Sequence, residues 1–165
     1  MSYREEMKQM IMGLLTKMPP ENEKLDRAIR KVYAKALEEA KQTGGSIESM
    51  TYEVLEGIEE ALSIYPELIE STLQRSAFLM ADLLHHSAKV DIAKREKRLA
   101  CAKDALDEVI KAEKMHLMES LDAFKAYAQD HQYVQFEKSL DFTASTITHY
   151  VLKLAGEMMY NHEDD

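Results

Sequence analysis

The clearest metal-binding spacing in this 165-residue sequence is a carboxylate and an imidazole three residues apart, Glu113 and His116. On a helix these positions share a face, so both groups could reach one metal ion. Asp82 and His85 repeat the spacing earlier in the chain. In di-iron carboxylate bundles, two Glu-x-x-His pairs face inward together with two further glutamates. Because one pair here has Asp in place of Glu, and no further glutamates can be assigned, we expect no metal and keep this site as a minor alternative.

Other catalytic patterns are missing from the sequence. It contains no Gly-rich phosphate loop, no Gly-x-Ser-x-Gly elbow and no His-Glu-x-x-His, which are the patterns of three large groups of enzymes. The single cysteine, Cys101, is predicted to be a buried and inert thiol, although nearby cations could lower its pKa. We therefore predict no catalytic residue and no cofactor, and lean towards a protein that is not an enzyme.

Composition and charge limit the classes of partner that the protein can bind. The formal net charge is −9 and the pI is about 5.2, which disfavours nucleic acid because phosphate backbones are bound by clustered cations. One cysteine rules out an internal disulfide framework. No apolar run approaches the roughly 18 residues of a membrane span, and no amino-terminal apolar leader is evident. The expected location is the cytoplasm.

Local signals predict three helices in the first 65 residues. Ser2 can cap a helix whose apolar positions run to Met18 before Pro19 and Pro20. A second helix starts near Asn22 and ends at Gly44, the residue type that favours a left-handed C-cap. A third follows from Ser46 or Ser49 and contains Gly57, where close packing of another backbone would explain a glycine inside a helix.

The next 89 residues, 67–155, contain neither Gly nor Pro. Their apolar positions recur in steps of 4 and 7, which fits either one helix from Pro66 to about Gln129 or two helices. We favour two helices that turn near Ser87–Asp91, with Asp91 as the N-cap of the second. Asp130 is predicted to cap the last helix.

These elements define an all-α fold class. We expect an elongated bundle of five or six helices, in which three short N-terminal helices pack with two long antiparallel ones. Residues 1–160 form one domain, and residues 161–165 form an acidic frayed tail.

Self-association is the function that this architecture favours. Three short helices cannot cover every apolar face of helices of 30 or more residues, so a remaining stripe should contact another subunit or a ligand. We predict a non-enzymatic scaffold or interaction protein that forms a homo-oligomer, most simply a dimer, through coiled-coil-like helices. A second alternative to the metal-binding bundle is an amphipathic coat protein on a lipid or polymer surface. The predicted interface stripe consists of Leu99, Leu106, Ile110 and Leu117.

A second predicted surface is acidic. Residues 46–86 contain one cation, Arg75, and eight carboxylates. Glu56, Glu59 and Glu60 lie far from the basic residues that follow this segment, so we expect them to be unbalanced. Such a surface could attract a basic protein partner through long-range electrostatics, although a simple solvated face is the alternative.

Overall fold

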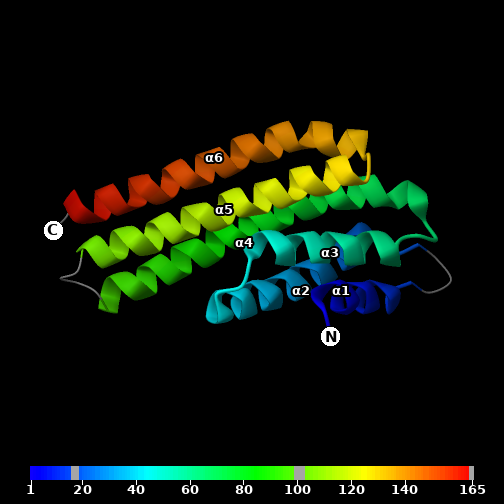
Figure 1. Cartoon of the computed structure of the whole chain (residues 1–165), viewed down its shortest axis with the longest axis horizontal. Coiled ribbons are helices and arrows are strands. Elements are labelled where there is room, and N and C mark those ends of the chain that lie inside the picture. Colours follow the sequence, from blue (N-terminus) through cyan, green and yellow to red (C-terminus); the bar gives the residue numbers. More distant parts are fainter. Residues whose placement is uncertain (16–18, 99–102, 164–165) are drawn as a thin grey trace.

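The computed structural model describes the backbone of residues 1–15, 19–98 and 103–163. It describes the side chains over the same ranges except at residues 98, 103–104 and 155–163. The fold is all-α, as the sequence predicts, and the described part contains six α-helices and one 3-10 turn, η1 (Figure 1). The elements are α1 (Tyr3–Met12), α2 (Asn22–Thr43), α3 (Ile47–Ala61), η1 (Pro66–Leu68), α4 (Ile69–Arg98), α5 (Lys103–Asp130) and α6 (Val134–Glu163).

The helices form layers along a long axis. The long helices are α4, α5 and α6, three rather than the expected two, and α5 runs antiparallel to the other two (Figure 1). On one side, α6 packs against both α4 and α5; on the other side, α2 packs on α4 and α3 packs on α5. Helix α1 packs against α3 and α2. The α4–α5 pair is therefore the central layer, and it extends past the α2–α3 turn at one end of the molecule.

The helix ends confirm several local predictions. Ser2 and Ser46 each accept a hydrogen bond from the backbone amide three residues later, which satisfies an otherwise unpaired donor. Gly44 adopts the left-handed conformation, with φ of 69°, at the end of α2. Helix α1, however, ends at Met12 with Gly13 as its C-cap, so the prediction that it continues to Met18 is wrong.

The predicted turn at Ser87–Asp91 is also wrong, because α4 continues through it to Arg98. Neither side chain caps a helix. Both instead accept hydrogen bonds from Lys41 of α2, and this contact uses the polar groups that suggested a break. The chain does form two helices here, with the boundary between Arg98 and Lys103.

Asp130 is the last residue of α5 and not the first cap of α6. The turn that follows is a Schellman motif, in which the amides of Tyr133 and Gln132 bond the carbonyls of Ala128 and Gln129. Gln132 has φ of 58° at the position that usually requires glycine. The absence of that glycine explains why the sequence placed this helix boundary about three residues too early.

The start of α6 is capped by a residue from another helix. Tyr133 precedes α6 and offers no carboxylate or hydroxyl suited to a local cap. Glu70, in the first turn of α4, accepts a hydrogen bond of 3.1 Å from the amide of Phe136. Its negative charge also lies at the positive end of the α6 dipole. At the other end, α6 continues to Glu163, three residues into the segment predicted as frayed.

The apolar core accounts for the predicted interface stripe. Leu106, Ile110 and Leu117 are at most 5% exposed within the single chain. Their own chain covers them, so they are not available to a second copy. Leu99 lies outside the described residues. The expectation that the short helices leave this stripe exposed is therefore wrong for these three positions. The sequence-based prediction had two long helices, and the third long helix was not counted among those that cover the stripe.

Thr143 is a weak point in this core. Its side chain on α6 is fully buried, and its hydroxyl has no hydrogen-bond partner among the described residues. We expect Thr143→Val to raise the free energy of unfolding by about 1 kcal/mol, because it removes a desolvated polar group at nearly constant volume. Chemical denaturation would measure the change.

Thr51→Val is the matched control for Thr143→Val. Thr51 is equally buried, but its hydroxyl lies 2.8 Å from that of Tyr33. That variant should lower the free energy of unfolding, because it leaves the Tyr33 hydroxyl unpaired. If both valine variants were destabilised equally, the Thr143 hydroxyl would have a partner after all.

Candidate functional site

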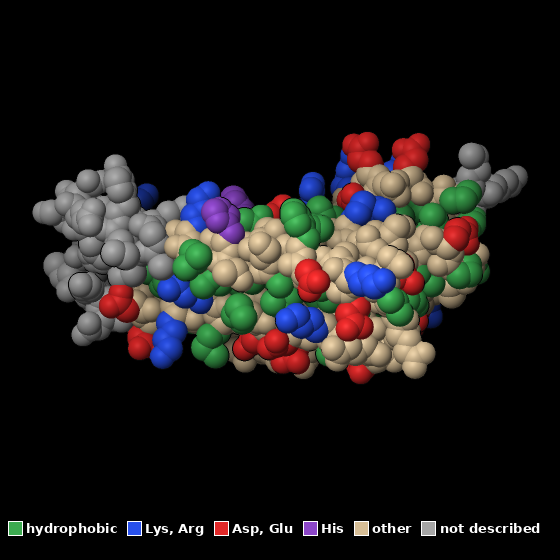
Figure 2. Space-filling view, turned by 90° about the horizontal axis from the view of Figure 1, so that it is seen from above, with side chains coloured by type: hydrophobic (Ala, Val, Ile, Leu, Met, Phe, Trp, Pro, Cys, Tyr) green, Lys and Arg blue, Asp and Glu red, His purple; other side chains and the backbone are tan. Residues whose placement is uncertain are grey.

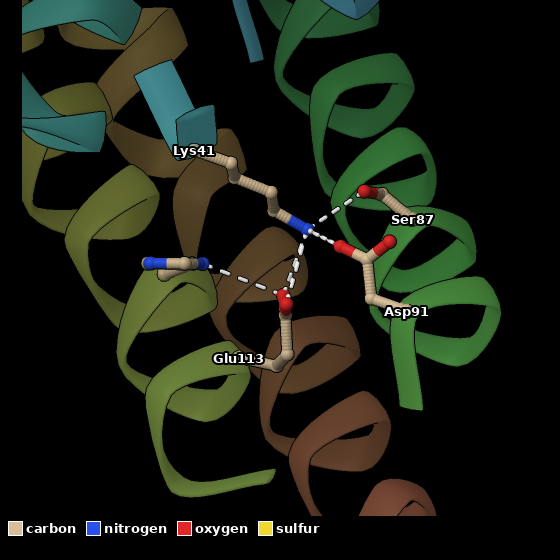
Figure 3. Close-up of polar contacts among 5 residues, drawn as sticks. Lys41, Ser87, Asp91 and Glu113 are labelled. Carbon is tan, nitrogen blue, oxygen red and sulfur yellow. Dashed lines mark hydrogen bonds and ion pairs between the residues drawn. The ribbon is translucent and has the colours of Figure 1, made fainter. Parts of the chain in front are cut away.

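A buried ion cluster joins three helices around Lys41 (Figure 3). The Lys41 ammonium donates to Ser87 Oγ at 2.7 Å, to Asp91 Oδ2 at 2.9 Å and to Glu113 Oε2 at 2.9 Å. His116 Nδ1 lies 3.4 Å from the same Glu113 oxygen. An ammonium has three protons, so these three acceptors saturate it.

Helix geometry places each member of the cluster. Ser87 and Asp91 are four residues apart on α4, and Glu113 and His116 are three apart on α5, so each pair shares a face of its helix. Lys41 reaches both faces from the last turn of α2, where a cation also suits the negative end of the helix dipole. The cluster thus fixes the C-terminal end of α2 against the α4–α5 pair.

Burial makes this cluster energetically important. The side chains of Lys41 and Glu113 are 15% and 8% exposed. Burial opposes ionisation of Glu113, but the hydrogen bonds and positive charge of its neighbours outweigh this and hold the pKa of Glu113 below its ordinary value. Glu113 therefore remains a carboxylate at neutral pH, and it depends on Lys41 for compensation.

The second acidic-x-x-His pair lies elsewhere. The Tyr150 hydroxyl of α6 donates to Asp82, and the Tyr150 ring stacks on His85 with centroids 4.1 Å apart. Asp82 and His85 consequently contact α6, whereas Glu113 contacts Lys41 of α2 and His116 contacts Glu113. Within residues 1–15, 19–98 and 103–163, no group of three or more His, Cys, Asp or Glu side chains is placed to hold a metal ion. The structure does not bring the four candidate ligands together.

The predicted acidic surface is balanced by its own chain. Glu60 lies 3.5 Å from Arg4 and 3.7 Å from Lys8, both on α1. Arg4 also lies close enough to act electrostatically on Glu56, although burial raises the pKa of this carboxyl. The expectation that this end of the segment stays unbalanced is therefore wrong for Glu60, because the sequence does not show that α1 folds back onto α3.

Glu59 is occupied in a different way. It accepts a hydrogen bond of 2.6 Å from the Tyr127 hydroxyl, and His131 Nδ1 lies 3.6 Å from the same oxygen. The rings of Tyr127 and His131 stack with centroids 4.1 Å apart, and Tyr52 meets Tyr127 edge-on. Burial and the bond to Glu59 raise the pKa of Tyr127. This group ties α3 to the end of α5 and leaves Glu59 little freedom to meet a partner.

A cleft of about 1210 Å³ opens beside the Lys41 cluster. It lies where the α2–α3 turn ends and α4 and α5 continue, and residues of α2, α4 and α5 line it. Besides the cluster itself, its charged lining includes Lys94 and Arg95 of α4, Glu38 of α2 and Glu119 of α5. None of these four makes an ion pair with another described residue. The sequence contained no signal for this cleft, since its α2 wall is about 40 to 85 residues away in the sequence from its α4 and α5 walls.

No family model, no curated protein and no solved structure matches the chain. None of the described helices combines the length and the apolar character needed to cross a membrane.

Proposed function

We propose that this protein is a non-enzymatic interaction protein whose long helices bring two copies together. The observation that supports this most directly is the cleft at the step where α4 and α5 extend past the α2–α3 turn. Such a step leaves two long helices without their neighbouring layer, and a second chain can supply that layer. The surface proposed for self-association is thus the cleft, because the leucine stripe is buried within the single chain.

The state of the charged side chains favours binding over chemistry. A general base or nucleophile must be able to exchange a proton with a substrate. In the Lys41 cluster, the ammonium is saturated and Glu113 is tied to both Lys41 and His116. These contacts hold three helices together. The free charges lie on the rim of the cleft, where they suit recognition of another surface.

On the described part of α6, the large exposed hydrophobic side chains do not gather into one patch. Phe142 and Leu152 on α6 are 68% and 66% exposed. From the side on which α6 lies, however, hydrophobic side chains are scattered among charged ones (Figure 2). Isolated apolar residues of this kind are common on proteins that do not associate. The step therefore fits a binding role better than the described outer face of α6 does.

We expect light scattering after size-exclusion chromatography to give twice the chain mass of 19.0 kDa at micromolar concentration. Two-fold dimers are the commonest form of homo-oligomer, and a single open step on each copy suits that symmetry. A monomer at every concentration up to the solubility limit would contradict the proposal. Elemental analysis of protein purified without a nickel column tests the metal-binding alternative, which stoichiometric iron or manganese would restore.

A further inference from the structure

Among the described residues that line the cleft, equal numbers of cations and carboxylates have no ion-pair partner, and they lie on separate walls. Lys94 and Arg95 project from α4, and both are exposed. Glu38 on α2 is exposed and Glu119 on α5 is half-buried. The other two carboxylates in the cleft, Asp91 and Glu113, already pair with Lys41. The charges available to a partner are therefore two positive on one wall and two negative on the others.

A surface of this kind is complementary to itself. In a two-fold contact, the same patch of both copies meets, so that if residue i faces residue j of the partner, j also faces i. A patch with a single sign of charge would repel its copy, whereas a patch with separated, equal charges can pair with itself after rotation. A basic or an acidic partner would instead meet repulsion from half of the cleft.

The shape of the step suits the same contact. The residues of α4 that follow Asp91 and the residues of α5 that precede Glu113 form the overhang beyond the α2–α3 turn, and the distance from Asp91 to Arg98 is roughly 11 Å at 1.5 Å per residue. An inverted second copy places its own overhang in the space that α2 and α3 leave open. The rigid ion cluster of Lys41 forms the inner wall in each copy, so neither chain must rearrange its core.

We infer that the cleft at the α2–α3 step is the face on which two copies of this chain dimerise, with Lys94 and Arg95 of each copy opposite Glu38 and Glu119 of the other. This inference rests on the proposed self-association and names the surface and the pairing. The contact is isologous, and the charge pairs form twice. Since Lys94, Arg95 and Glu38 are exposed, the dimer weakens as salt rises.

Charge-reversal variants test the pairing. Variant A has Lys94→Glu and Arg95→Glu, so that all four of the positions without an ion-pair partner become negative. Variant B has Glu38→Lys and Glu119→Lys, so that all four of the positions without an ion-pair partner become positive. Each variant alone should dimerise at least ~10-fold more weakly than the parent in sedimentation equilibrium, because like charges then face each other across the contact. An equimolar mixture of A and B should recover a dimer, since opposite charges then meet at both ends of the contact.

A matched control separates this site from a general charge effect. Lys111→Glu with Lys125→Glu makes the same change in net charge as variant A, on exposed positions of α5 outside the cleft. This control should dimerise like the parent, and circular dichroism should show that all variants melt as folded proteins. Recovery in the A–B mixture cannot arise from misfolded chains.

The outcomes distinguish this inference from the proposed function. A parent protein that is monomeric at all concentrations overturns both. If the parent is a dimer and variants A and B dimerise as strongly as the parent, only the pairing at the cleft is overturned. The chain would then self-associate through another face. A mixture that stays monomeric, after A and B have each lost the dimer, overturns the two-fold pairing.

Discussion

Replacing Gly57 with alanine is expected to lift α1 from the bundle. An added Cβ at Gly57 would lie 2.5 Å from the Arg4 carbonyl oxygen and 2.8 Å from Met7 Cβ. The first of these is a backbone atom, which cannot move aside without moving the helix. The crossing of α1 over α3 therefore requires a residue without a side chain at this point.

The expected loss is large because α1 is held by a few buried residues. Met7 and Ile11 are fully buried, and exposing both costs about 3–6 kcal/mol. Alanine is about 1 kcal/mol better than glycine inside a helix, which offsets part of this loss. Gly57→Ala should thus lower the free energy of unfolding by roughly 2–5 kcal/mol, measured by urea denaturation.

Gly45→Ala provides the matched control for this prediction. A Cβ there would meet its nearest atom, Thr43 Oγ1, at 3.4 Å, and that atom belongs to a side chain that can rotate. This variant should change stability by less than about 1 kcal/mol. Limited proteolysis should cut near residue 12 in Gly57→Ala only. Equal stability of Gly57→Ala and the parent would contradict the close packing of α1 on α3.

Lys41→Met should be the second strongly destabilising change. Methionine has a similar length but no charge, so Glu113 would stay buried without its compensating cation. Breaking a buried ion pair by removing one partner typically costs about 3–5 kcal/mol. The double variant Lys41→Met with Glu113→Gln should recover much of that loss, because it also removes the stranded charge. If the double variant lost as much as the single one, packing rather than charge would explain the effect.

The pH dependence gives an independent measurement of the same contact. The pKa of Glu113 is lower in the folded protein than its ordinary value of 4.5. Its contribution to stability is therefore present above about pH 4.5 and is lost as the pH falls through the folded pKa. In Lys41→Met this contribution disappears, so the difference in stability between parent and variant should be largest near neutral pH and should shrink in acid.

The fold follows from sequence patterns to the extent that those patterns are local. Ser2, Ser46 and Gly44 each control a helix end through contacts within a few residues, and the structure confirms all three. Gly57 indicated close packing because an interior glycine has a cost, although its partner could not be named. The sequence-based prediction misplaces the α5–α6 boundary, because Gln132 adopts a left-handed conformation that is usually found at glycine.

The site depends on contacts that local patterns do not contain. Lys41 lies 46, 50 and 72 residues from the three groups that it binds. The sequence correctly places Glu113 and His116 on one face of a helix, and in the structure Lys41 compensates the charge of Glu113. Ser87 and Asp91 have the chemistry of helix caps as well as of hydrogen-bond acceptors, and only the tertiary structure decides between these uses.

The cap that Glu70 provides for α6 also sets the axial register of two parallel helices. Farther along the same pair, the Tyr150 hydroxyl donates to Asp82. Twelve residues separate Glu70 from Asp82, and fourteen separate Phe136 from Tyr150, which correspond to similar lengths of about 18 and 21 Å of helix. Sliding α6 by one turn, about 5.4 Å, would break both contacts at once. Apolar side chains alone would tolerate such a slip far better, so these two polar contacts make one alignment of α6 on α4 the stable one.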